Sequence, residues 1–244
     1  MAPVSLPPGN ESFLTTRWSL VLQAAGQDSE HAQAALASLC RAYWYPLYAF
    51  VRRKGVAAQD AEDVVQSFFA RLLDKQALAQ VRPEKGRFRS FLLASIQNHL
   101  ANLRDAERSL KRGGGQALLD IDFAAADARY CLEAGALDAQ KSFERAWALD
   151  LLARALSGLE AEYRASERGA LFDVLKPELV GGEGAPYADY AARLSSNVAA
   201  VKVAVHRLRK RYRERLRAAI AETVAGEAEI ESEISDLFRA LTPN

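Results

Sequence analysis

Apolar residues recur at spacings of three and four along nearly the whole chain, which predicts α-helices. Two stretches show this most clearly, 60–75 and 86–115. In the first, apolar pairs four residues apart predict one broad buried stripe, made of Val64, Val65, Phe68, Phe69, Leu72 and Leu73. In the second, the predicted core face consists of Phe88, Phe91, Leu92, Ile96, Leu100 and Leu103. No stretch shows the alternation of a strand, so we expect an all-α fold.

Glycine and proline clusters divide these helices into groups. The clusters fall at 7–10, 52–55, 82–86, 112–116 and 176–186. Three consecutive glycines, Gly113–Gly115, would destabilise a helix interior, so we expect a hinge there between two halves of the chain. The stretch after the hinge contains apolar residues at 118–123, and we therefore expect it to lie against another part of the protein.

Residues 186–217 predict two short helices joined by a tight turn. The first helix has an apolar face formed by Tyr187, Tyr190, Ala191 and Leu194. In the turn, Ser195, Ser196 or Asn197 can cap the second helix. The second helix has an apolar face formed by Val198, Val201, Val205 and Leu208. Its opposite, basic face carries Lys202, His206, Arg209 and Arg213. Two helices of this kind are typical of a helix-turn-helix motif.

The formal net charge of +1 conceals a strong segregation of charge along the chain. Residues 201–217 hold eight Lys/Arg and a single acid, whereas 222–236 hold six acids and no base, and 120–138 hold five acids and one base. A helix as basic as 201–217 is either a solvated surface or the binding surface for a polyanion.

The acidic tail allows two interpretations. Apolar residues recur there at helical spacing, namely Ile230, Ile234, Leu237, Phe238 and Leu241, and they are accompanied by Glu227, Glu229, Glu231 and Glu233. The tail is either a terminal helix that covers a core, or a segment that docks on a basic DNA-binding face in the free protein. The acidic linker is an alternative candidate for the second role.

The basic helix has the residue types that nucleic-acid recognition requires. Ala199 and Ala200 are small enough to permit close approach to base edges, and Lys202 and His206 can reach into a groove. Cations further along the helix suit phosphates, and these are Arg209, Lys210, Arg211 and Arg213.

The first half of the chain carries a second polar surface. Four polar residues lie away from the apolar stripe, namely Asp60, Glu62, Asp63 and Gln66. Acids in a first helical turn favour the helix dipole, and this explanation stays open beside a binding surface. Asn98 and Asn102 share a helix face between basic flanks, where their amides can hydrogen-bond base edges; ordinary exposed residues are the other explanation.

Both halves resemble one protein family. YAFVRRKG, AQDAEDVVQSFFARLL and KGRFRSFLLASIQNHLANL together resemble the sigma-two domain of bacterial sigma factors of the extracytoplasmic-function (ECF) class, in the sigma-70 superfamily. PYADYAARLSSNVAAVKVAVHRLRKRYRERLR resembles their sigma-four domain. The resemblance implies a sigma-two-like domain at 12–112, an acidic linker at 113–137, a sigma-four-like domain at 138–221 and an acidic C-terminal helical tail at 222–244.

The resemblance also implies roles for individual residues in transcription initiation. Docking on the polymerase clamp carries over to Asp60, Glu62, Asp63 and Gln66. Reading of the melted minus-ten element carries over to Arg87, Arg89, Asn98, Asn102 and Arg104. Reading of the duplex minus-thirty-five element carries over to Ala199, Ala200, Lys202, Val203, His206 and Arg207. The implied partners are promoter DNA and core RNA polymerase, through its largest subunits and its flap; an anti-sigma protein or a kinase as regulator is left open.

Two departures from the family pattern limit what can be carried over. Ser195 and Ser196 stand where the family usually has glycine and an aliphatic residue, which bears on the geometry of the turn. Asn102 stands where an aspartate is common, so a promoter preference does not transfer directly.

Other classes of protein fit the sequence less well. The three histidines are scattered, and no catalytic, metal or cofactor constellation is visible, so we expect neither an enzyme nor a cofactor. Cys40 and Cys131 lie far apart, and no signal or membrane segment is evident, which suits the cytoplasm. The alternative function is a stand-alone helix-turn-helix regulator with an N-terminal partner- or ligand-binding domain; an all-helical RNA-binding protein is a weaker one.

Overall fold

The computed structural model describes residues 30–73, 87–107, 122–133, 137–180, 184–224 and 226–242. Within these ranges the chain forms nine α-helices, two short 3-10 helices and no strand, so the expectation of an all-α fold is confirmed. The helices of the first half are α2 (Glu30–Arg53), α3 (Ala58–Leu73), α5 (Phe88–Glu107) and α6 (Phe123–Leu132). The second half contains α7 (Ala139–Ala165), α8 (Gly169–Leu175), η2 (Lys176–Glu178), α9 (Tyr187–Arg193), α10 (Val198–Ala221), η3 (Glu227–Glu229) and α11 (Ile230–Leu241).

The first hydrophobic core lies among α2, α3, α5 and the first half of α7. The predicted stripes face it, because Val65, Phe69, Phe88, Leu92 and Ile96 are each fully buried. Large aromatic side chains of α2 fill its centre. There the indole N–H of Trp147 donates to the Tyr43 hydroxyl at 3.1 Å, which satisfies both polar groups where water is excluded.

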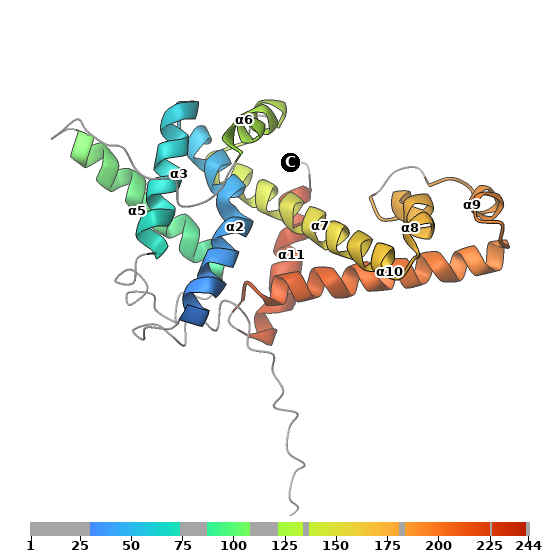
Figure 1. Cartoon of the computed structure of the whole chain (residues 1–244). Coiled ribbons are helices and arrows are strands. Elements are labelled where there is room, and N and C mark those ends of the chain that lie inside the picture. The colour runs from blue at the N-terminus through green and yellow to red at the C-terminus, as the bar shows by residue number, and fades with distance from the viewer. Residues whose placement is uncertain are drawn as a thin grey trace, which may run out of the picture.

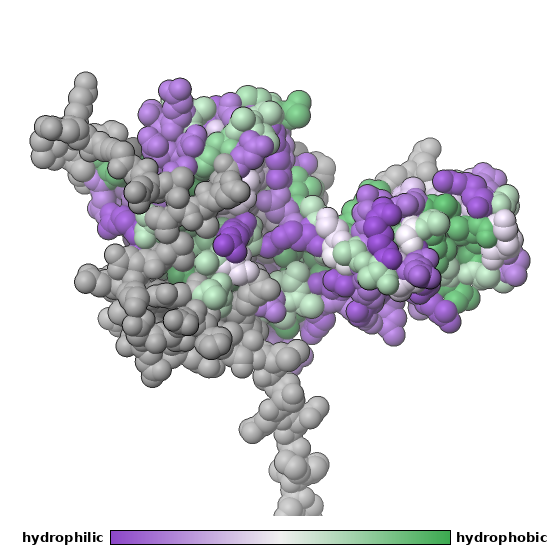
Figure 2. All heavy atoms as spheres, viewed as in Figure 1, coloured by the Kyte–Doolittle hydropathy of each residue, from purple (hydrophilic) through white to green (hydrophobic). Residues whose placement is uncertain are grey.

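A smaller second core lies among the end of α7, α8, α9 and the start of α10. Its buried residues are Leu159, Tyr163, Phe172, Leu175, Tyr190, Ala191, Val201, Val205 and Leu208. The members of this core that follow Leu175 belong to the apolar faces predicted for the two helices of 186–217. Figure 2 shows this lobe projecting from the rest of the molecule, with apolar and polar surface mixed on the visible face.

Helices α7 and α10 are long enough to take part in both cores. They run side by side in Figure 1, and the α10 residues Leu216 and Ile220 pack into the first core together with Ile230 and Leu237 of α11. The division between the cores therefore falls within these two helices. The domain boundaries expected from sequence stay a prediction, and Gly113–Gly115 lies outside the described residues.

Part of the expected acidic linker forms α6 and packs on α2. Asp122 caps this helix by accepting the amide of Ala125 at 2.9 Å. The Tyr48 hydroxyl donates to Asp127 at 2.9 Å, and the Tyr45 hydroxyl donates to Glu133 at 2.8 Å. The described part of the linker thus lies against the first core.

Candidate nucleic-acid interface

The turn between α9 and α10 is built by two different caps. Helix α9 ends at Arg193, and Ser195 two residues later has φ 47°, in the left-handed region; the amide of Ser196 donates to the Ala191 carbonyl at 2.9 Å. Of the three residues that could cap α10, Asn197 does so, because its side chain accepts the Ala200 amide at 2.8 Å. These contacts fix the start of α10 relative to α9, as a helix-turn-helix requires.

The outward face of α10 carries every residue expected to read the minus-thirty-five element. All of them are exposed, namely Ala199, Ala200, Lys202, Val203, His206 and Arg207. Val201, Val205 and Leu208 face the second core on the opposite side. Val198 is 39% exposed although the pattern put it on the apolar face, because the first residue of the helix lies beyond the edge of that core.

The four cations expected to contact phosphates are all exposed, and they differ in their partners. Arg209 pairs with Glu178 at 2.7 Å, and Lys210 lies 4.0 Å from Glu214. Arg211 pairs with Glu162 at 2.8 Å, and its hydrogen bonds to that carboxylate raise the pKa of the guanidinium. Arg213 donates to the carbonyl of Arg209 at 3.3 Å and has no acidic partner within the described ranges.

The expected polymerase-binding residues lie on the side of α3 that faces away from the core. Asp60 and Asp63 are exposed, and neither has a cationic partner among the residues that the structure describes. Glu62 and Gln66 are half-buried, and the Gln66 amide donates to Glu62 at 3.3 Å. The four residues therefore form one continuous polar face with two free carboxylates.

Helix α5 presents Asn98 and Asn102 on one exposed face. Arg104 belongs to the same helix, but its side chain falls outside the described residues. His99, between them in sequence, points the other way and lies 3.1 Å from the Ser67 hydroxyl. Burial, aided by the charge of Arg71, lowers the pKa of His99 to about 4, so the ring is neutral near neutral pH.

Arg87 and Arg89 are covered by helix α11. The guanidinium of Arg89 makes a bidentate contact with Glu233, with N–O distances of 2.7 and 3.0 Å, and also pairs with Asp236. Arg87 lies 2.8 Å from Glu233 and pairs with Asp236 as well. The Arg89 guanidinium stacks over the Trp147 ring, 4.7 Å from its centroid.

Burial and ion pairing shift the pKa values of Arg89 and Asp236 in opposite directions. Burial lowers the pKa of Arg89, but hydrogen bonds and charge from Glu233 outweigh it and leave that pKa raised. Burial also raises the pKa of Asp236, yet a hydrogen bond from Arg87 and the charge of Arg89 outweigh it, and the pKa of this carboxyl is lowered. Arg89 and Asp236 are therefore both charged near neutral pH.

Sequence reasoning named Glu233 among the acids of the tail without a specific partner, and it did not single out Asp236. Glu233 is fully buried, and it follows Ile230 by three residues and precedes Leu237 by four, so it lies on the same helix face as the apolar residues. An acid on an apolar stripe is the signal that predicts a buried cationic partner.

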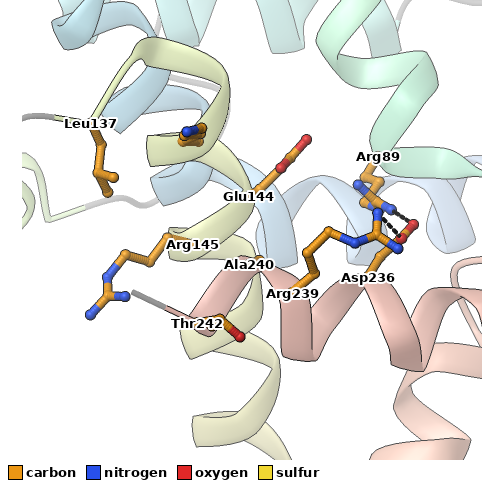
Figure 3. A pocket seen from close by; sticks show the side chains of 9 residues that line it. Arg89, Leu137, Glu144, Arg145, Asp236, Arg239, Ala240 and Thr242 are labelled. Atoms are coloured by element: carbon orange, nitrogen blue, oxygen red, sulfur yellow. Dashed lines mark hydrogen bonds and ion pairs between the residues drawn. The ribbon is translucent and has the colours of Figure 1, made fainter. Parts of the chain in front are cut away.

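A cavity of about 250 Å³ opens beside this cluster, between the start of α7 and the end of α11. Its charged lining consists of Arg89, Lys141, Glu144, Arg145, Asp236 and Arg239. Figure 3 shows Arg89 and Arg239 reaching Asp236 at one side of it. Within the described ranges no group of three His, Cys, Asp or Glu side chains could hold a metal ion, and none of the described helices is both long and apolar enough to cross a membrane.

One comparison with known protein families finds a match to part of the chain. Residues 39–109 match the model of sigma-70 region 2. The matched segment extends from α2 through α3 to the end of α5, and so includes the acidic face of α3 and the two asparagines of α5. No curated protein and no solved structure matches the chain. The match to region 2 supports placing this chain in the sigma-70 family, with a role as a sigma factor in transcription initiation.

Proposed function

We propose that this chain is a sigma factor of the ECF class, which binds core RNA polymerase and directs it to promoters with defined minus-ten and minus-thirty-five elements. The observation that carries the proposal is the combination of two features in one chain. A sigma-70 region 2 segment at 39–109 is followed by a helix-turn-helix whose second helix exposes Lys202, His206 and Arg207.

The polymerase contact is assigned to α3. Among the residues that the structure describes, Asp60 and Asp63 have no cationic partner, so pairing with a basic surface of another protein would break none of the described ion pairs. The helix-dipole explanation accounts for Asp60, the acid in the first turn of α3, but not for Asp63 and Gln66, which lie further along the helix.

The two promoter elements are assigned to α5 and α10. Asn98 and Asn102 present amides one turn apart on an exposed face, which suits hydrogen bonding to the edges of unstacked bases. On α10, Ala199 and Ala200 allow a close approach to a major groove, and Lys202 and His206 extend from the same face. The cations further along α10 lie where a helix inserted in a groove meets the phosphate backbone.

The experiment that tests the proposal is capture of core RNA polymerase by the tagged protein. Asp63→Arg reverses a charge on an exposed side chain, so the fold should keep its melting temperature while capture is lost. Asp189→Arg is the matched control, because Asp189 is an exposed acid on α9 outside the matched segment. Equal capture by the wild type and both variants would remove α3 from the proposal.

The same experiment separates a sigma factor from a stand-alone regulator. A regulator would bind promoter duplex tightly without polymerase, and it would fail to capture polymerase in the wild-type form. A sigma factor should capture polymerase without DNA. Binding of duplex alone together with absent capture would favour the regulator.

A further inference from the structure

Helix α11 covers the two arginines that the proposed function assigns to the minus-ten element. Only 11% of the Arg89 side chain and 20% of the Arg87 side chain are exposed. Both arginines direct their guanidinium groups at Glu233 and Asp236. A nucleic-acid strand therefore cannot reach these guanidinium groups while α11 stays in place.

Two carboxylates of α11 occupy the hydrogen-bonding groups with which Arg87 and Arg89 could hold other anions. Glu233 and Asp236 are three residues apart on one helix, so their side chains leave the same face about one turn apart. Arg89 grips Glu233 through two parallel N–H···O bonds, the same bidentate geometry with which arginine holds a phosphate. Asp236 then bridges Arg89 and Arg87, as a second anion would.

Packing of α11 does not require these charges. Ile230 and Leu237 are buried in the first core, and they hold the helix against α7 and α10. A buried ion pair adds little stability over an apolar pair of the same shape, because desolvation offsets the attraction. The charges do provide a polar contact that a competing polyanion can replace group by group.

We propose that α11 is an autoinhibitory segment whose Glu233 and Asp236 occupy the anion-binding site of Arg87 and Arg89, so that single-stranded promoter DNA binds there only when α11 moves away. This inference rests on the proposed function for its ligand. It goes beyond that function because it states that the free protein cannot bind at this site the single strand that it contacts in the promoter complex.

The cavity beside α11 supplies a place where the exchange can begin. Lys141 and Arg145 line it from α7, and neither has an acidic partner within the described ranges. Arg239 lines the same cavity and pairs with Asp236 through the carboxylate oxygen that Arg89 does not contact (Figure 3). A phosphate that enters the cavity meets these cations before it reaches Asp236, and it would weaken the hold on that carboxylate.

Asp236→Asn tests the inference in the full-length protein. The probe is a fluorescein-labelled single-stranded DNA of mixed sequence, followed by anisotropy without polymerase. The loss of one charge-assisted contact should populate the open form and tighten binding about tenfold. Arg87→Ala in the same background should abolish that gain, because it removes part of the site that the DNA would occupy.

The matched control is Glu231→Gln. Glu231 lies on the same helix and pairs with Arg217, away from Arg87 and Arg89, so its neutralisation changes the net charge equally. The control should bind the probe like the wild type. If Asp236→Asn and Glu231→Gln tighten binding to the same extent, the gain is a general charge effect and the inference is overturned.

Hydrogen exchange on the wild type gives a readout that needs no variant. The amides of α11 should exchange faster when the single-stranded probe is bound, and unchanged protection in the bound state would overturn the inference. Probe binding that is equal in the wild type and in Asp236→Asn refutes α11 as an inhibitor but leaves the proposed function intact. Absence of both probe binding and polymerase capture refutes the two together.

Discussion

Replacement of Glu233 by alanine should strongly destabilise the protein, although the residue is an acid in a polar tail. The Glu233 side chain is 0% exposed and contacts two arginines that are 11% and 20% exposed. Its removal leaves those guanidinium groups with Asp236 as their shared carboxylate. Breaking a buried pair from one side costs about 3–5 kcal/mol, because the remaining charge stays desolvated. For a chain of this length that loss corresponds to a fall in melting temperature of about 6–20 °C.

The matched comparison is Glu231→Ala, two residues earlier. Glu231 is 70% exposed and pairs with Arg217 on the surface, so its loss should cost no more than about 1 kcal/mol. Urea unfolding followed by circular dichroism measures both variants. Equal losses of unfolding free energy for the two variants would refute the assignment of Glu233 to a buried cluster. The double variant Arg89→Met/Glu233→Met should lose less unfolding free energy than the two single variants lose together, and that result would further support the buried cluster.

Three further outcomes are expected. Ser195→Gly should stabilise the protein by about 1 kcal/mol in urea unfolding, because Ser195 has φ 47°, while Ser196→Gly, at a position without positive φ, should bring no gain. Because the pKa of His99 is lowered from 6.5 to about 4, the unfolded state binds more protons than the folded state between these two pH values. The free energy of unfolding should therefore fall as the pH falls through this window, by at most about 3 kcal/mol. His99→Gln should flatten that decline when unfolding is measured against pH. Lys202→Ala should cost the holoenzyme about 1–3 kcal/mol of binding free energy on a matched minus-thirty-five element and little on mismatched ones. Arg213→Ala should weaken binding to all sequences alike and lower the slope of log affinity against log salt by about 0.9. Identical sequence and salt dependences of the two variants would contradict the assignment of base contacts to one part of α10 and phosphate contacts to another.

Helical spacing accounts for the parts of the fold that could be predicted. In the described parts of 60–75 and 86–115 the predicted stripes point inward, and so do the apolar faces of 186–217 except at Val198, because a residue's place on a helix is set by its neighbours three and four positions away. The exposed polar face of α10, which we propose reads the minus-thirty-five element, follows from the same periodicity.

Contacts between distant segments could not be predicted in this way. Arg89 and Glu233 are 144 positions apart, and nothing in local spacing links an arginine in the first turn of α5 to an acid in the tail. The participation of α7 and α10 in both cores is similarly a tertiary outcome, because the Gly and Pro clusters mark where helices end and not which core each half of a helix joins. The burial of Glu233 was detectable in part from its place among the apolar residues of α11, but its partner was not.

The central claim is that this chain makes core RNA polymerase start transcription at particular promoters. In vitro transcription with purified core polymerase on fragmented genomic DNA, followed by mapping of transcript 5′ ends, tests that claim most directly. The account predicts transcripts that depend on the protein and begin at sites sharing two upstream elements, and it predicts their loss with Asp63→Arg. Absence of any protein-dependent start site, with polymerase active on a control template, would contradict it.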